Sequence, residues 1–456
     1  MFATDDTIVA IATPPGRGGL GVVRLSGPQA LRIAGELLAG HPALEPRRAT
    51  LARVTGALGT APIDEVIATF FPGPASYTGD DVVEISGHGS PVVLGGMVSG
   101  ATAAGARLAG RGEFTLRAFL NGRIDLVQAE AVADLVNAVT PLQARATFDQ
   151  LQGTLTAAIQ RIERDLFGLA ARLEAAVDFP DEGYEFVAPG AAAEEIGACA
   201  SRIDELLGQA RRGRVVREGC QVTILGTTNT GKSSLFNQLL GSERAIVTPL
   251  EGTTRDLLTE RIEIGGILVD LVDSAGVRES LDVIEREGVD RARRATAVAD
   301  LVLLVLDGSR LLADGDRALL AETGSRERVV AINKCDLKPA WGEEALAGEP
   351  GPVVRTSAKE GTGLAELRDA MTERLAGRVD WEPPAVTNAR HVALLEEARG
   401  AFARAAGTAR AGGSAGSEEF VLADLRDVRA ALEAITGERT TEELLDEIFS
   451  RFCIGK

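Results

Sequence analysis

The sequence predicts a multidomain α/β and α+β chain, in which an α/β domain is inserted between two segments of a helical domain. Three observations predict this fold class. The chain has 456 residues, about three times the length of a common domain. Short β-rich runs give way to helical periodicity near residue 120, and apolar strands alternate with helices from about residue 221 to 376. Helical periodicity then returns from residue 390.

The domain boundaries are expected where this texture changes. We expect an N-terminal α+β domain at 1–120, a first helical segment at 121–217, the inserted α/β domain at 218–378 and a second helical segment at 379–456. Such an insertion is tolerated because the ends of a domain often lie close together at its surface.

The N-terminal part alternates runs of β-forming residues with turns rich in Gly and Pro. Strands are expected at Ile8–Ala12, Gly21–Leu25, Val66–Phe71 and Val82–Ile85, and an Ala- and Leu-rich helix at Pro28–Leu38. This mixture predicts a small α+β domain.

Apolar residues then recur at steps of three and four, which is the period of a helix that buries one face. The recurring residues are Leu151, Leu155, Ile159, Ile162, Leu166, Leu169 and Leu173. The pattern breaks at Phe179-Pro180-Asp181, because proline cannot continue the hydrogen-bond ladder of a helix.

Composition and charge exclude several classes of protein. Apolar residues make up 45% of the chain, but the longest strongly apolar stretch, near Leu301–Leu306, is too short to cross a bilayer. We expect no membrane insertion. The start carries Asp5 and Asp6 and lacks a secretion signal, so a cytoplasmic location is expected. The net charge of −18 disfavours wholesale binding to nucleic acid.

A phosphate-binding loop follows the first strand of the α/β segment. Residues 226–233 fit the pattern G-x-x-x-x-G-K-S between strand-like and helical runs, which is the context that the motif requires. Backbone amides surround the β-phosphate at a helix N-terminus, Lys232 adds a charge at the β/γ oxygens, and Ser233 can bind Mg²⁺. The nucleotide contacts expected here are Asn229, Thr230, Gly231, Lys232, Ser233 and Ser234.

Two further segments are expected at the γ-phosphate. Thr254 lies in a loop that can deliver a hydroxyl to Mg²⁺ and an amide to the γ-phosphate. The strand Ile267–Val272 runs into Asp273-Ser274-Ala275-Gly276, which resembles the D-x-x-G motif of GTPases. In such a motif Asp273 would hold Mg²⁺ through water and Gly276 would sense the γ-phosphate.

The next motif reads guanine. The strand Val329–Ile332 ends in Asn333-Lys334-Cys335-Asp336, which matches the N-K-x-D motif of the GTPase superfamily. A carboxylate accepts two hydrogen bonds from the N1–H and N2–H₂ edge of guanine, and adenine has no such edge. Ser357-Ala358-Lys359 matches the supporting S-A-K loop. The motifs together predict GTP in preference to ATP.

The residue after D-x-x-G poses a catalytic problem. Ras-like GTPases carry a glutamine there that orients the attacking water, whereas this chain has Val277, which cannot hydrogen-bond to water. Another residue must then orient the water. Carboxylates are available just downstream, at Glu279, Asp282, Glu285 and Glu287.

The whole chain resembles the MnmE (TrmE) family of tRNA modification GTPases. The resemblance is carried by the segments 6–19, 112–123 and 129–135 and by Cys453-Ile454-Gly455-Lys456. It implies an N-terminal tetrahydrofolate-binding domain that dimerises, a discontinuous helical domain and an inserted Ras-like P-loop GTPase domain.

The resemblance also implies how hydrolysis is catalysed. Glu285 sits where the family places the glutamate that orients the hydrolytic water, so Glu285, Lys232 and Thr254 are the expected catalytic residues. A bound K⁺ can stabilise developing charge where other GTPases use an arginine. The family's K⁺ site is matched by Asn229, Thr248, Leu250 and Thr253. Thr248 and Thr253 are also expected to contact GTP, and Mg²⁺ is expected at Ser233 and Thr254.

Reduced-folate binding is implied at Arg24, Glu84, Arg123 and Lys456. The implied cofactor is 5,10-methylenetetrahydrofolate, with 5-formyltetrahydrofolate as an analogue. A carboxylate suits the donors of a pterin, and Arg or Lys suits a glutamyl carboxylate. Cys453 is a candidate reactive thiol at this site, and the alternative is a small buried side chain in the last turn.

The partners implied by the resemblance are a second copy of the chain, tRNA, and an FAD-dependent flavoprotein of the MnmG (GidA) family in a heterotetramer or larger complex. Together they would add an aminomethyl or carboxymethylaminomethyl group to the wobble uridine of tRNA. A different class of function stays open, namely a GTP-dependent RNA or ribosome assembly switch without modification chemistry. Folate binding separates the two.

Overall fold

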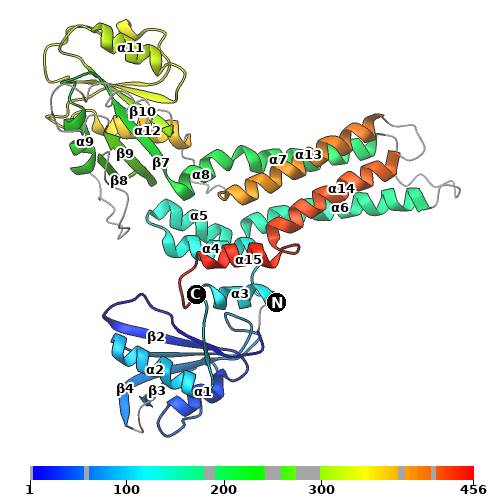
Figure 1. Ribbon diagram of the computed structural model, residues 1–456. Helices are drawn as coiled ribbons and strands as arrows, with labels where there is room; N and C mark the ends of the chain where they lie inside the picture. Colours follow the sequence, from blue (N-terminus) through cyan, green and yellow to red (C-terminus); the bar gives the residue numbers. More distant parts are fainter. Residues whose placement is uncertain are drawn as a thin grey trace. The chain divides into compact units, whose positions relative to one another are not determined.

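The computed structural model describes residues 4–55, 61–178, 190–241, 258–273, 298–377, 386–411 and 417–456. The chain divides into two compact units (Figure 1), which we describe one at a time. The first unit comprises Met1–Val136, Gln150–Phe167 and Arg426–Lys456, and the second comprises Asn137–Asp149 and Gly168–Leu425. Among the described residues, no helix is both long and apolar enough to cross a membrane.

The first unit contains a six-stranded sheet of order β3-β4-β5-β2-β1-β6. Only β1 and β6 pair in parallel among its neighbouring strands. The strands are β1 (Ile8–Ile11), β2 (Gly18–Ser26), β3 (Thr50–Thr55), β4 (Pro62–Phe71), β5 (Val82–Gly89) and β6 (Arg107–Leu108). Helices α1 (Ala30–Leu37) and α2 (Pro91–Ala103) bury their apolar side chains against one face of this sheet. Side chains alternate between the faces of a strand, so Arg24 and Glu84 lie on the opposite face.

A second core of the first unit joins segments from both ends of the sequence. Apolar residues of α3 (Glu113–Leu120), α4 (Leu126–Asn137) and α15 (Glu442–Ser450) pack together with Phe452. The rings of Phe449 and Phe452 lie 5.1 Å apart between centroids. The segment 450–456 is therefore fixed against the residues that follow the N-terminal sheet.

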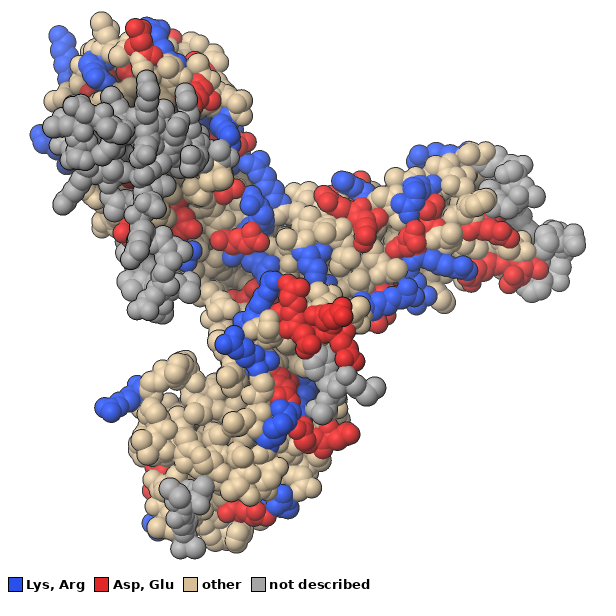
Figure 2. All heavy atoms as spheres, in the orientation of Figure 1, with Lys and Arg blue, Asp and Glu red and all other residues tan. Residues whose placement is uncertain are grey.

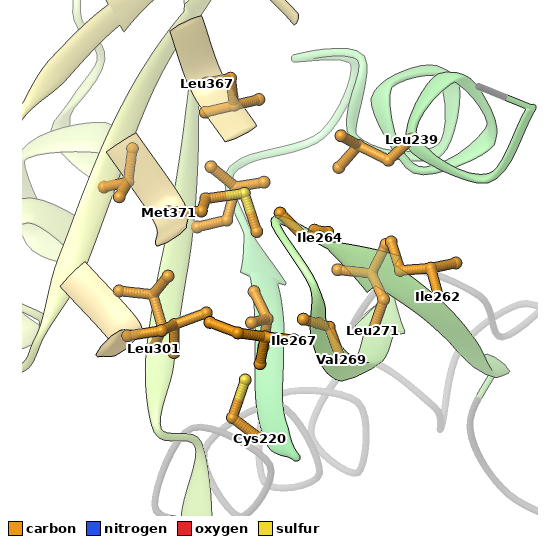
Figure 3. Packing of buried hydrophobic residues seen from close by; sticks show 14 of the residues in the cluster. Cys220, Leu239, Ile262, Ile264, Ile267, Val269, Leu271, Leu301, Leu367 and Met371 are labelled. Carbon is orange, nitrogen blue, oxygen red and sulfur yellow. The ribbon is translucent and has the colours of Figure 1, made fainter. Parts of the chain in front are cut away.

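The second unit contains a six-stranded sheet of order β12-β11-β10-β7-β9-β8, in which only β8 runs antiparallel to its neighbour. The strands are β7 (Cys220–Leu225), β8 (Leu258–Ile264), β9 (Ile267–Asp273), β10 (Leu301–Asp307), β11 (Arg328–Asn333) and β12 (Val353–Arg355). Helices α9 (Lys232–Gly241) and α12 (Leu364–Ala376) cover one face, as Figure 3 shows for Leu239, Leu367 and Met371. Helix α11 (Asp314–Glu322) and the 3₁₀ turn η1 (Glu343–Leu346) cover the other.

Further helices belong to the second unit. They are α5 (Pro141–Leu151), α7 (Ala191–Gly208), α8 (Ala210–Glu218) and α13 (Ala389–Ala411). Helices α7 and α13 pack along their length (Figure 1). Helices α6 (Thr154–Asp178) and α14 (Ser417–Thr436) contribute residues to both units.

The fold class predicted from the sequence is confirmed, and so is nearly every predicted strand and helix. One expectation about the helical segment is wrong. Leu151 belongs to the end of α5, because the chain turns at Gly153 with a φ of +84° and α6 begins only at Thr154. The other six leucines and isoleucines of the pattern are buried along α6. The predicted helix break at 179–181 lies outside the described residues, just after α6 ends at Asp178.

Candidate functional site

The phosphate-binding loop lies between the end of β7 and the start of α9. Gly226 has a φ of +155°, and a Cβ there would lie 2.4 Å from the carbonyl oxygen of Val305, so only glycine fits. Asn229 has a φ of 63°, a left-handed conformation that residues with a side chain rarely adopt. This local backbone places the loop amides at the N-terminus of α9, where an anion is favoured.

Two residues of the loop bring charge and a hydroxyl to one place. The ammonium of Lys232 donates to the carbonyl oxygen of Thr227 at 2.9 Å. Burial lowers the pKa of Lys232, and the nearby Asp273 carboxylate opposes that shift. The hydroxyl of Ser233 donates to Asp273 Oδ2 at 3.1 Å. Ser233 and Asp273 are hard oxygen donors of the kind that Mg²⁺ prefers, so these two residues fit the predicted Mg²⁺ site.

Asn333 connects the three nucleotide motifs. Its side chain is almost fully buried at the end of β11, and its Nδ2 donates to the carbonyl oxygen of Thr230 at 2.8 Å. Its Oδ1 accepts a hydrogen bond from the amide of Ala358 at 3.0 Å. The hydroxyl of Ser357 donates to Asp336 Oδ1 at 2.7 Å, which orients that carboxylate. The structure thus brings the predicted phosphate loop, guanine reader and S-A-K loop together.

Other predicted nucleotide residues are either exposed beside these motifs or lie outside the described residues. Ser234 and Lys359 are exposed beside these motifs. Thr248, Leu250, Thr253, Thr254, Gly276 and Glu285 lie outside the described residues. The predicted water-orienting residue and most of the predicted K⁺ ligands therefore stay predictions.

The predicted folate residues Arg24 and Glu84 form an ion pair between neighbouring strands. Arg24 donates through Nε at 2.9 Å and lies 2.8 Å away through Nη2, both to Glu84 Oε1. The guanidinium of Arg24 also lies 5.4 Å from the ring centroid of Tyr77 and 5.6 Å from that of Phe114, within the range of cation–π contact. Sequence reasoning did not single out these two aromatic rings.

The other two predicted folate positions converge on the same place. The carbonyl oxygen of Gly455 accepts from Arg24 Nη1 at 3.5 Å, which brings the half-buried Lys456 next to the ion pair. Arg123 Nε donates to the carbonyl oxygen of Ser76 at 3.2 Å, and Ser76 precedes Tyr77 in the chain. Arg24 and Arg123 therefore contact one loop, at Tyr77 and Ser76, and Glu84 and the chain at Gly455 contact Arg24, although these positions are far apart in the sequence.

Cys453 is exposed, so the alternative of a small buried side chain is wrong. Its carbonyl oxygen accepts from the amide of Gly112 at 3.4 Å, which fixes the segment next to the start of α3. The exposed thiol agrees with a reactive role, which stays a prediction.

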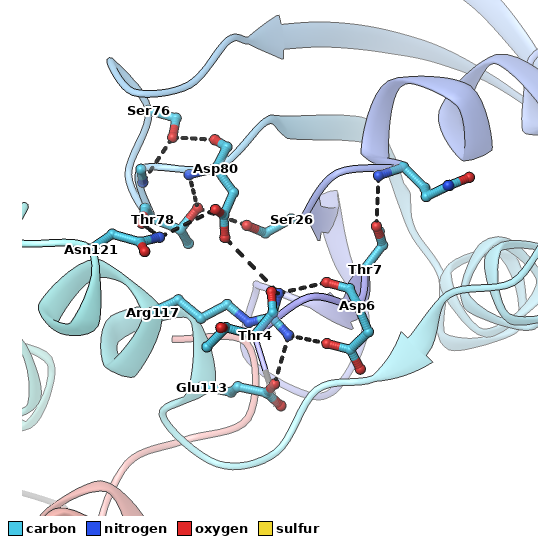
Figure 4. A network of polar contacts seen from close by, with 12 residues as sticks. Thr4, Asp6, Thr7, Ser26, Ser76, Thr78, Asp80, Glu113, Arg117 and Asn121 are labelled. Carbon is cyan, nitrogen blue, oxygen red and sulfur yellow. Dashed lines mark hydrogen bonds and ion pairs between the residues drawn. The ribbon is translucent and has the colours of Figure 1, made fainter. Parts of the chain in front are cut away.

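The buried Arg117 lies beside the loop that contains Ser76, Tyr77 and Asp80, and sequence reasoning missed it (Figure 4). Arg117 is 1% exposed and pairs with Asp6 and Glu113, and Nη1 of Arg117 lies 4.0 Å from Asp80 Oδ2. Burial raises the pKa of Asp80, and the attraction of Arg117 opposes the rise. Asn121 Nδ2 donates to the carbonyl oxygen of Thr78 at 2.8 Å. No pattern in the sequence distinguishes a buried arginine of this kind from an exposed one.

The comparisons with known proteins identify a family. The model of the GTP-binding protein TrmE N-terminus matches residues 7–123, and the model of the MnmE helical domain matches residues 126–453. The tRNA modification GTPase MnmE of Koribacter versatilis is 44% identical over 458 residues, covering 99% of each chain. Those of Azoarcus sp. and Symbiobacterium thermophilum are also 44% identical, over 99% of this chain and 98% and 100% of theirs.

Family models cover most of the chain, full-length relatives share well over 30% of its residues, and the phosphate loop, the N-K-x-D motif and the S-A-K loop lie together. The chain belongs to the MnmE (TrmE) family of tRNA modification GTPases.

Proposed function

We propose that this chain is a K⁺-dependent GTP hydrolase that modifies the wobble uridine of tRNA in the cytoplasm. It acts as a homodimer together with an FAD-dependent flavoprotein of the MnmG (GidA) family. The modification adds a carboxymethylaminomethyl or aminomethyl group, and 5,10-methylenetetrahydrofolate supplies the bridging carbon. The observation that carries this proposal is the contact between Arg24, Glu84 and Gly455, because it gathers a candidate folate site in the same chain as a GTP site.

The chemistry of the gathered residues suits a reduced folate. Glu84 is partly exposed and offers carboxylate oxygens to the N–H and NH₂ donors of a pterin. Tyr77, which is 36% exposed, provides aromatic surface beside Arg24, while the fully buried Phe114 packs against the same guanidinium. Arg123 and Lys456 supply positive charge for a glutamyl tail. The folate supplies the one-carbon unit, while these residues bind and orient it.

The geometry of Asn229 supports the K⁺ part of the proposal. A left-handed backbone at a non-glycine residue costs of order 1 kcal/mol and persists where function requires it. In this conformation the Asn229 side chain is available to a cation beside the phosphates. A fixed K⁺ would supply the positive charge that an arginine finger supplies in other GTPases.

The exposed face of the N-terminal sheet supports the homodimer. Leu51 and Ile67 are paired across β3 and β4, and they are 71% and 47% exposed. Adjacent apolar side chains on one face are typical of a surface that another copy covers.

The decisive experiment is calorimetric titration of the full-length protein with 5-formyltetrahydrofolate. We expect saturable binding that is lost when Lys456 is removed and strongly weakened by Glu84→Gln. Arg48→Gln, which changes an exposed charge on the same domain, is the matched control and should bind like the wild type. If the wild type binds no folate while it hydrolyses GTP, the assembly switch is the better interpretation.

A further inference from the structure

A short segment after β10 contacts both halves of the nucleotide site, although it belongs to none of the motifs described above. It runs from Asp307, the last residue of β10, to Arg310. Asp307 is 5% exposed. Its Oδ2 accepts from the ammonium of Lys334 at 2.7 Å, and its Oδ1 accepts from the amide of Ser309 at 2.9 Å and its hydroxyl at 2.6 Å. Ser309 thus holds the Asp307 carboxylate in place, and the carboxylate in turn fixes Lys334 of the guanine reader.

The backbone and side chain of Lys334 are both costly to order. Lys334 has a φ of 66°, in the left-handed region, and its side chain is a long flexible stem that ends in a charge. Ordering that stem costs side-chain entropy, which the ion pair with Asp307 offsets. Asp307 is also well placed to stay ionised. Burial alone would raise its pKa, but hydrogen bonds from Lys334 and Ser309 outweigh burial and lower it.

The other end of the segment reaches the phosphate loop. Arg310 Nη2 donates to the hydroxyl oxygen of Thr227 at 2.7 Å, and that hydroxyl donates to Asp316 Oδ1 at 2.7 Å. Asp316 is buried at the start of α11. The carbonyl oxygen of the same Thr227 accepts from Lys232 and from Thr230 Oγ1. The hydroxyl of Thr227 is therefore engaged by the segment after β10 and by Asp316, and its carbonyl oxygen by the loop itself.

We propose that Asp307 and Arg310 are positioning residues of the nucleotide site. Asp307 fixes Lys334 beside the guanine, and Arg310 with Asp316 fixes Thr227 and hence the phosphate loop. The two halves of the site are in this way held to one short segment. This inference goes beyond the proposed function, since it concerns nucleotide binding alone and is independent of folate, tRNA or the flavoprotein.

A double-mutant cycle on the full-length protein tests the first half of the proposal. We measure the dissociation rate of a fluorescent GDP analogue for the wild type, Asp307→Asn, Lys334→Met and the double variant. Loss of a charge-assisted hydrogen bond predicts a rate about tenfold faster in each single variant. The double variant should be less than multiplicatively faster than the two single variants, because the contact under test joins Asp307 directly to Lys334. Independent, multiplying effects overturn the proposal.

The second half has its own cycle, with Arg310→Met, Thr227→Val and the double variant, and the same expectation of non-additivity. Asp314→Asn changes an exposed carboxylate in the first turn of α11 and should leave the rate unchanged. Thermal unfolding of the nucleotide-free variants separates positioning from stability. A faster rate that only follows a lowered melting temperature counts against the proposal. If Asp307→Asn does not fold, Ser309→Ala should accelerate dissociation in the same direction, and an unchanged rate overturns it.

Discussion

Asp336 illustrates how much discrimination one carboxylate can provide. Ser357 orients it, and Asn333, three residues earlier, is fixed to the loops on both sides. The Asp336 carboxylate is thus already oriented for the nucleotide and loses little conformational freedom on binding. Such pre-organisation raises affinity mainly by reducing the entropy cost of binding.

Replacing this carboxylate by an amide should change the base preference. Asp336→Asn is expected to weaken GTP binding by about 2 to 3 kcal/mol, because the amide keeps only one acceptor oxygen, so one of the two guanine donors faces its NH₂ group. Xanthosine triphosphate, which has a carbonyl in place of the 2-amino group, should bind the variant better than it binds the wild type. Competition against a fluorescent GDP analogue measures both. Equal GTP affinity in the two proteins would remove the guanine-reader assignment.

The lowered pKa of Asp307 gives a prediction about acid. A carboxylate whose pKa is depressed by folding contributes stability that is present above its unfolded pKa and is lost as the pH falls through the folded one. The Asp307–Lys334 pair should therefore contribute equally from pH 8 to about 5 and fade below pH about 4. Urea unfolding of the wild type and Asp307→Asn at these pH values measures the difference. A gap that widens in acid would contradict the ion-pair account.

At the scale of elements, two helical glycines occupy contrasting surroundings. Gly213 in α8 faces the carbonyl oxygen of Val386, and a Cβ there would lie 1.7 Å from that oxygen. Gly197 in α7 has no neighbour within 4 Å of the same position. Close packing of α8 on the start of the segment before α13 thus depends on the missing side chain of Gly213.

Alanine substitutions at these two glycines should change the free energy of unfolding in opposite directions. Gly213→Ala should destabilise the protein by about 1 to 3 kcal/mol, because the methyl group forces the backbone of residue 386 to move. Gly197→Ala should stabilise α7 by about 0.5 to 1 kcal/mol, since alanine has the higher helix propensity. Chemical denaturation measures both changes. A Gly213→Ala variant as stable as the wild type would show that the close approach is not required.

Elements were predictable where local chemistry decides them. The continuous apolar run of β10 is enough to predict a buried strand. The Gly265-Gly266 pair is enough to predict the turn between β8 and β9, where these glycines have φ of 58° and 82°. The two-residue strand β6 was not predictable, because Arg107 and Leu108 pair with β1 only through a distant contact. Leu151 was misassigned for a related reason, since periodicity alone does not reveal that Gly153 ends one helix before another begins.

For the whole molecule, the sequence identified the nucleotide site far better than the folate site. Nucleotide motifs are short and contiguous, so residues 226–233 and 333–336 can be recognised directly in the sequence. Arg24, Glu84 and Lys456 are separate positions whose meeting depends on the complete fold, and only resemblance to a family pointed to them. Tyr77, Phe114 and Arg117 were missed because burial and stacking leave no local pattern.

Cation dependence tests the proposed mechanism at the level of the assembled enzyme. GTP hydrolysis should be several-fold faster in K⁺ than in Na⁺, because only the better-fitting cation stabilises the developing charge. Asn229→Gly should abolish the difference, and it is the preferred variant because glycine adopts the left-handed backbone of Asn229 without strain. Hydrolysis rates in matched KCl and NaCl measure the effect. Equal rates in both salts would rule out the proposed cation.

The fit of Gly455 against the first strand has a consequence for biosynthesis. Its φ of +95° and the 2.3 Å that would separate a Cβ from the carbonyl oxygen of Ile11 leave room for nothing larger. Arg24 emerges from the ribosome more than 400 residues before this glycine does. At 5 to 20 residues per second, the arginine waits roughly 20 to 90 s for its partner. The domain that is translated first therefore completes its folding last. A purification tag fused after Lys456 would lie beside Arg24.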